Sequence, residues 1–214
     1  MPVIFAAAVG LALALVPRDD AAAPAAAPER PHRRDTVQVG MALAAETVLS
    51  PGSVCPEGAT TPCILGSGGG VAVRFGYRFG GPWYFGGAYE FTHHDSSNLL
   101  RLAILQQLRA EGRYYFEHGR RATAFLAGGA GLHLYGSDWE ATTGGLLATV
   151  GGGVELELSA NTVIGCALMY RLLLPRGYED SAGQERAQGP LGFGLAHMLG
   201  LEFAVEVRDP VPHW

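Results

Sequence analysis

The sequence predicts an all-β fold: a closed, antiparallel, up-and-down transmembrane β-barrel of eight strands, with short periplasmic turns and longer extracellular loops. Three observations predict it. From Thr36 onward, apolar and polar residues alternate with a period of two. One face of each predicted strand is broad and aromatic, whereas the other mixes glycine with arginine and glutamate. Short and long connections also alternate strictly along the chain, as they do in transmembrane barrels.

The composition excludes several other classes of protein. The chain has 214 residues, enough for one domain, with 31 glycines and only 16% charged residues. Its longest apolar stretch, residues 146–174, carries Glu155 and Glu157 near its centre. Each carboxylate would cost a lipid-embedded helix roughly 2.5–3.5 kcal/mol, which argues against membrane helices. The net charge of −5 and the absence of long Lys/Arg runs predict no nucleic-acid partner.

The N-terminal segment has the features of an export signal. Residues 3–16 form an apolar block of signal-peptide length, followed by Ala-x-Ala cleavage options. We therefore predict a signal peptide over residues 1–27 and a disordered Ala/Pro/Arg-rich linker over 28–35. An uncleaved N-terminal anchor helix is the alternative.

The first three strands show the alternation most clearly. Residues 37–46 place Val, Met and Leu opposite Gln, Gly and Ala. Residues 71–79 place five apolar side chains opposite two arginines, and residues 83–91 repeat the pattern after the tight turn at 80–82. These last two segments therefore predict a hairpin.

Five further strands follow by the same rule. They cover residues 101–116, 122–134, 144–158, 162–173 and 191–207. Each predicted strand is long enough to cross a bilayer at a tilt, which takes about 9–11 residues. The short connections are residues 80–82, 117–121 and 159–161, and the long ones are 47–67, 93–100, 136–143 and 175–190.

The polar face of these strands predicts a charged lumen. An eight-stranded barrel is just wide enough for its interior side chains to fill it. We therefore predict an ion-pair network without an open pore, centred on Arg74, Glu90, Arg109, Glu111 and Glu202. The full set is Arg74, Arg78, Glu90, Arg109, Glu111, Arg113, Glu155, Arg171 and Glu202, with Glu157 and Glu206 on the same face. A narrow proton or ion path is the functional alternative.

A soluble, lipocalin-like ligand-binding barrel has the same strand count and must be weighed. It would need its apolar face inside and its charges outside. A soluble barrel that instead turned this polar face inward would bury eleven arginine and glutamate residues in its core, and each would cost several kcal/mol if unpaired. The polarity therefore favours lipid outside the barrel.

Over residues 36–207 the pattern resembles the small outer-membrane barrels of the OmpA/OmpX and opacity-protein kind. The resemblance implies a monomer in the bacterial outer membrane, in contact with lipid and lipopolysaccharide and inserted by the barrel-assembly machinery. Barrels of this kind usually end their last strand with an aromatic residue. Here the predicted last strand is followed by a tail, 208–214, with two prolines and a terminal Trp214.

Aromatic residues lie where the two membrane interfaces are expected. Trp83, Tyr114 and Phe116, together with Phe79, lie near the short turns. The predicted interface residues near the long loops are Tyr89, Phe91, Tyr135 and Trp139.

Two of the three cysteines lie close together. In an exported protein, Cys55 and Cys63 in a Pro/Gly/Thr-rich segment predict a disulfide. Cys166 lies in a predicted strand, where we expect it to pack as a small apolar residue.

The most reactive-looking stretch is residues 92–98. His94 and Ser96 could project the same way and are weak candidates for a hydroxyl nucleophile and its base. Lipid A deacylases carry a slightly similar pattern, so such a hydrolase is an alternative function. We instead predict no enzymatic activity, no cofactor and no metal, and a structural or surface-interaction role in which the loops 47–67 and 175–190 could bind an external ligand.

Overall fold

A computed structural model describes residues 35–55, 63–97, 100, 102–116, 121–137, 140–179, 185–187, 189 and 192–211. The predicted signal peptide, nearly all of the linker, Trp139 and Trp214 lie outside these residues, so they stay predictions. The chain divides into two units, Met1–Pro31 and His32–Trp214, and only the second contains described residues. Across the described residues, no helix has the length and apolar character needed to span a bilayer.

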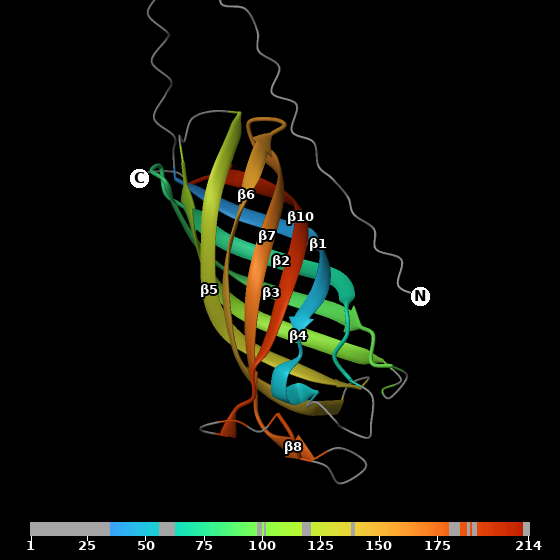
Figure 1. Ribbon diagram of the computed structural model, residues 1–214. Coiled ribbons are helices and arrows are strands. Elements are labelled where there is room, and N and C mark those ends of the chain that lie inside the picture. Colours follow the sequence, from blue (N-terminus) through green and yellow to red (C-terminus); the bar gives the residue numbers. More distant parts are fainter. Residues whose placement is uncertain are drawn as a thin grey trace, which may run out of the picture. The chain divides into compact units, whose positions relative to one another are not determined.

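Eight antiparallel strands close into one barrel (Figure 1). Each strand pairs with its neighbours in the sequence, and the last strand pairs with the first. The strands are β1 (Thr36–Ser50), β2 (Gly68–Arg78), β3 (Trp83–His94), β4 (Ala103–Tyr115), β5 (Ala122–Ser137), β6 (Glu140–Glu157), β7 (Thr162–Pro175) and β10 (Ala196–Pro210). The predicted eight-stranded up-and-down barrel is therefore confirmed.

Two ends of the barrel can be distinguished. The turn end carries Thr36, Pro210 and the β2–β3, β4–β5 and β6–β7 connections, and the loop end carries the β1–β2, β3–β4, β5–β6 and β7–β10 connections. At the loop end, the β1–β2 connection contains a short 3₁₀ helix, η1 (Gly52–Val54), and the β7–β10 connection contains a small hairpin of β8 (Tyr178–Glu179) and β9 (Glu185–Arg186). Neither element was predicted, because two or three residues are too few for a periodic pattern.

The prediction of a long connection over residues 136–143 is wrong. Strand β5 continues to Ser137 and β6 begins at Glu140. The ladder continues past a register shift between Tyr135 and Gly136. Glycine and threonine in this stretch interrupt the apolar alternation without preventing strand pairing, so the hydrophobic pattern underestimates the strands.

The last strand is also displaced from its predicted range. It begins at Ala196 instead of residue 191 and extends to Pro210, beyond the predicted end at residue 207. Pro210 pairs with Thr36 at the end of the ladder, where its missing N–H is tolerated. As a result Arg208 belongs to the barrel and not to the tail.

The barrel is apolar outside and charged inside. Outward side chains such as Leu43, Phe75 and Leu108 are 59–65% exposed. Inward side chains such as Glu90 and Arg171 are fully buried. The sequence alternation therefore corresponds to an apolar outer belt and a polar core.

Close packing explains two of the inward glycines. Gly76 and Gly86 lie against the ring of Tyr84, itself an inward residue of β3. A Cβ atom at either position would stand 2.4 Å from the Tyr84 hydroxyl oxygen. Glycine here gives the ring room to lie against the inner wall.

Candidate functional site

The candidate site is the barrel interior, a charged lumen with a cluster of apolar side chains at its loop end. The structure places all nine charged residues predicted for the lumen inside the barrel, and all nine are buried. They lie on six strands, and on each strand they occupy alternate positions that point into the barrel. The same surface contains further charged residues, Glu46, Glu157, Glu206 and Arg208.

The loop-end half of the lumen is organised around Arg171. Its guanidinium contacts the carboxylates of Glu46, Glu90 and Glu202, the Glu90 contact being 2.7 Å. Arg109 contacts Glu90 at 2.6 Å and Glu202 at 3.0 Å. Two guanidinium groups therefore share the same two carboxylates.

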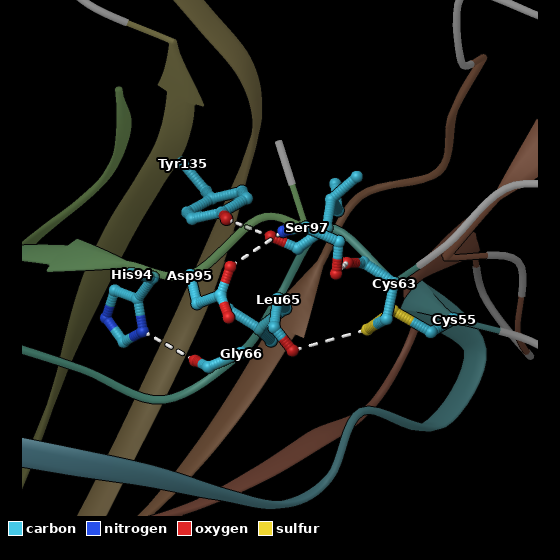
Figure 2. The surroundings of a disulfide bond; sticks show 9 residues. Cys55, Cys63, Leu65, Gly66, His94, Asp95, Ser97 and Tyr135 are labelled. Atoms are coloured by element: carbon cyan, nitrogen blue, oxygen red, sulfur yellow. Dashed lines mark hydrogen bonds between the residues drawn. A yellow bond between two sulfur atoms is a disulfide. The ribbon is translucent and has the colours of Figure 1, made fainter. Parts of the chain in front are cut away.

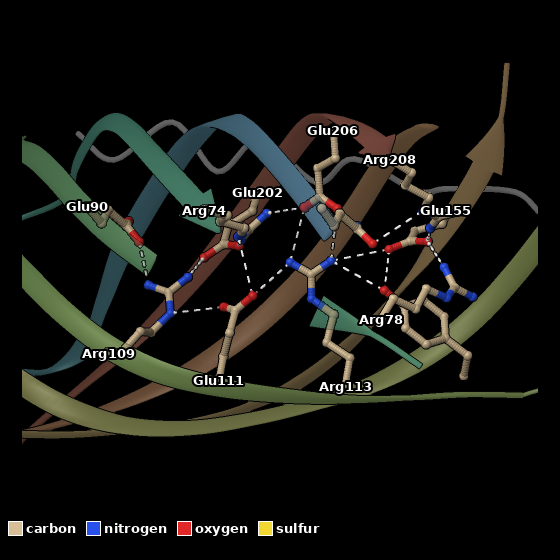
Figure 3. A network of polar contacts seen from close by, with 12 residues as sticks. Arg74, Arg78, Glu90, Arg109, Glu111, Arg113, Glu155, Glu202, Glu206 and Arg208 are labelled. Carbon is tan, nitrogen blue, oxygen red and sulfur yellow. Dashed lines mark hydrogen bonds and ion pairs between the residues drawn. The ribbon is translucent and has the colours of Figure 1, made fainter. Parts of the chain in front are cut away.

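The turn-end half is organised around Arg113 (Figure 3). Arg113 lies 2.9 Å from Glu111, 3.2 Å from Glu155 and 3.2 Å from Glu206. Arg74 connects the two halves, because it contacts Glu202 as well as Glu206. The ion pairs thus form one continuous network along the lumen.

Glu155 and Arg208 complete the network at the turn end. The Glu155 carboxylate contacts Arg208 and lies 3.1 Å from Arg78. Arg208 also reaches Glu157 at 3.3 Å. The guanidinium of Arg78 lies 3.7 Å from the centre of the Tyr115 ring, a cation–π arrangement.

Sequence reasoning missed Glu46 and Arg208 as members of the network. The period-two alternation of the first strand places Glu46 on the same face as Ala42 and Ala44, so its position in the lumen could have been predicted. Arg208 was assigned to the tail because prolines follow it. The lumen network, as used below, comprises Glu46, Arg74, Arg78, Glu90, Arg109, Glu111, Arg113, Glu155, Glu157, Arg171, Glu202, Glu206 and Arg208.

A cluster of apolar side chains lies at the loop end of the lumen. It joins barrel residues to residues of the β1–β2 and β7–β10 connections. Its buried members are Val54, Leu65, Ala103, Leu105, Tyr135, Leu147, Leu173, Ala187, Ala196 and Met198. The loops therefore fold inward over the mouth of the barrel.

The mouth segment, residues 51–55 and 63–67, is covalently closed by a disulfide. The predicted bond between Cys55 and Cys63 is confirmed, with the two Cα atoms 5.1 Å apart (Figure 2). The backbone of this segment pairs with the end of β3: Gly66 N–H donates to the Asp95 carbonyl at 2.8 Å, and Asp95 N–H donates to the Ser67 carbonyl at 2.9 Å. Cys166 is exposed on the outer face.

Tyr135 holds the mouth segment from the opposite wall. Its hydroxyl donates to the Ile64 carbonyl, and its ring is only 4% exposed. The prediction that Tyr135 belongs to an interface girdle is therefore wrong. Its inward position follows from the strand register, because Tyr135 is in phase with His133 and not with Leu134.

The other aromatic residues predicted for the interfaces lie on the outer face. Trp83, Tyr89, Tyr114 and Phe116 are 37–47% exposed, and Phe91 is partly exposed. The rings of Trp83 and Tyr114 meet edge to face at 5.0 Å. Their placement is compatible with a girdle, which remains a prediction.

The two candidate catalytic residues have different hydrogen-bond partners. Ser96 Oγ donates to the Leu100 carbonyl at 3.1 Å and accepts the Leu100 N–H at 3.2 Å. His94 instead lies inside the barrel, 2.9 Å from the Glu46 carboxylate. Among the described side chains, no group of three or more His, Cys, Asp or Glu residues is arranged to hold a metal ion.

Removal of the disulfide is expected to weaken the mouth. The double variant Cys55→Ser/Cys63→Ser should lower the free energy of unfolding by about 2–3 kcal/mol, since the bond closes a short loop. Urea unfolding of the refolded barrel measures this, and Cys166→Ser is the matched control. An unchanged midpoint for the double variant would contradict the structural role of the bond.

Fold and lumen together define a class: a closed eight-stranded barrel with an apolar exterior and an ion-paired interior. Among solved structures, the chain is similar to Neisserial surface protein A, with 16% identity over 82% of this chain and 97% of that chain, and a TM-score of 0.53. It is also similar to the outer membrane protein AlkL, solved in lipid bilayers, with 9% identity over 90% and 99% of the two chains and a TM-score of 0.53. The chain therefore has the fold of small eight-stranded outer-membrane barrels. No protein-family model and no curated protein sequence matches it.

Proposed function

We propose that the chain is an integral protein of the bacterial outer membrane with a structural or surface-interaction role, and that its lumen is plugged. The inverted polarity is the observation that carries this proposal. In water, a continuous belt of exposed Leu, Val and Phe side chains would be a large aggregation-prone surface. In lipid the same belt is solvated, and the closed barrel satisfies its backbone hydrogen bonds internally.

The plugged lumen predicts a barrel without a steady conductance. The space beside Arg74, Arg113 and Glu202 has a volume of about 10 Å³, close to the minimum for one water molecule. Purified protein inserted into a planar lipid bilayer should therefore give no stable open-channel steps. Lasting ion conductance from correctly folded protein would contradict the plug.

A surface role rests on the loop end, because connections 47–67 and 175–190 could present an external ligand site there. The orientation can be tested in cells. An epitope inserted between Glu179 and Glu185 should bind antibody on intact cells, whereas the same epitope at residues 159–161 should bind only after permeabilisation. The reverse pattern would contradict the proposed orientation.

The same proposal implies which molecules the protein contacts in the membrane. The protein would be a monomer surrounded by lipid and lipopolysaccharide and inserted by the barrel-assembly machinery.

The alternative function as a lipid hydrolase is less well supported, because Ser96 bonds the Leu100 backbone and His94 bonds a lumen carboxylate. A soluble lipocalin-like binder is opposed by the buried charges of the lumen network.

A further inference from the structure

His94 connects the mouth segment to the lumen network. Its ring is 1% exposed and lies at the end of β3. Nδ1 is 2.9 Å from the carbonyl oxygen of Gly66, in the mouth segment, and Nε2 is 2.9 Å from Oε2 of Glu46, in the lumen (Figure 2 shows the Gly66 contact). The same imidazole therefore bonds both parts of the site.

The first of these contacts fixes one ring proton. A carbonyl oxygen can only accept a hydrogen bond, so Nδ1 must carry the hydrogen. In a neutral imidazole, Nε2 would then present a lone pair. That lone pair would face a carboxylate oxygen at 2.9 Å, where two acceptors repel each other.

The second contact consequently requires a second proton. It resides on Nε2 or on Glu46 Oε2, and it belongs to the pair and not to either residue alone. The Thr92 hydroxyl, 2.9 Å from Nε2, does not remove this requirement, because Thr92 Oγ1 also donates to the Leu105 carbonyl at 3.3 Å.

The polar and aromatic groups around the pair come from five strands, and β2 places Gly68 beside both residues. Glu46 projects from β1 and Thr92 from β3, and the Tyr135 ring on β5 stands edge-on to His94 at 6.3 Å. The other Glu46 oxygen accepts from Gln107 on β4 at 3.2 Å and from Arg171 on β7. Glu46 Oε1 is thus satisfied by the network, and Oε2 faces His94.

We propose that the proton shared by His94 and Glu46 latches the disulfide-closed mouth segment to the lumen network, so that the mouth loosens as the pH rises. Loss of the proton leaves two buried acceptors in contact, which costs more than separating them. Because Nδ1 holds Gly66, movement of the ring away from Glu46 pulls on the mouth segment. The latch goes beyond the proposed function and depends only on the folded barrel.

Amide hydrogen exchange and side-chain NMR test the latch together. The full chain, refolded in detergent and labelled with ¹⁵N, is followed between about pH 5 and about pH 9. Protection factors for residues 64–67, corrected for intrinsic exchange, should fall about tenfold or more. The fall should coincide with the loss of the Nε2 proton of His94 or of the Glu46 carboxyl proton.

A conservative variant and a control sharpen the test. In Glu46→Gln the amide N–H donates to a neutral ring, so the protection of residues 64–67 should become independent of pH. His93→Gln, which changes an exposed neighbouring histidine, should keep the wild-type profile.

Two results overturn the latch: a flat wild-type profile in a folded barrel, or an Nε2 lone pair facing an ionised Glu46 across the whole range. If Glu46→Gln does not refold, the test is whether loss of protection and loss of the shared proton occur at the same pH in the wild-type protein. Heat-modifiable migration on SDS gels shows independently whether the barrel has folded. A chain that never forms a barrel would therefore contradict the proposed function, and a folded barrel with a flat profile contradicts only the latch.

Discussion

Replacement of Arg171 by methionine is expected to lower the free energy of unfolding by about 3–5 kcal/mol, the usual cost of breaking a buried ion pair. Arg171 contacts three carboxylates, those of Glu46, Glu90 and Glu202. Methionine fills much of the same volume but leaves these charges with fewer partners in a site closed to solvent. Urea titration of the refolded barrel in detergent, followed by tryptophan fluorescence, measures the loss.

The matched control for this prediction is Arg176→Met. Arg176 is exposed, just beyond the end of β7, and its loss should change stability by about 0.5 kcal/mol or less. Similar destabilisation by both variants would show that the effect is not specific to the lumen. A loss below about 1 kcal/mol in Arg171→Met would contradict the structural importance of the network.

A charge placed on the outer belt is the second large perturbation. Leu108 lies in the middle of β4 and is 59% exposed on the outer face. In a bilayer, Leu108→Arg should destabilise the barrel by about 2–4 kcal/mol, because the guanidinium would have to leave water for the hydrocarbon core. Reversible unfolding in lipid vesicles measures this cost.

Leu158 provides a control with the same exposure. It is also 59% exposed but follows β6 at a short turn, where the membrane interface is expected. Leu158→Arg should therefore cost only about 0–1 kcal/mol. Equal effects at the two positions would contradict the assignment of the belt to lipid, since only a membrane distinguishes their depths.

The alternation of residue types was enough to predict the strands and the two faces of the barrel. Arg74, Glu90 and Arg171 could be assigned to the lumen by counting alone, because a strand has only two faces and one of them is uniformly apolar. The members of the ion-pair network were predicted, but the individual pairs between distant strands were not. Which carboxylate meets which guanidinium depends on strand register and tilt, and neither is encoded in local spacing.

The loop end was the least predictable part. Tyr135 is of a residue type common in interface girdles, but its phase with His133 places it on the inner face, where its hydroxyl bonds the mouth segment. His94 was singled out for its chemistry, but its partner Glu46 is 48 residues away in the sequence. This contact depends on strand register across β2, because Gly68 pairs with Glu46 on β1 and with His94 on β3.

Heat-modifiable electrophoretic migration tests the central claim, that this chain is a membrane barrel with its apolar face outward. Residues 28–214 would be refolded into detergent and run on SDS gels with and without boiling, with circular dichroism as the measure of strand content. The account predicts a β-rich protein whose unboiled form migrates faster than its boiled form. A chain that is folded and soluble in plain buffer, with no shift on boiling, would contradict the claim and make a soluble ligand-binding barrel the better description.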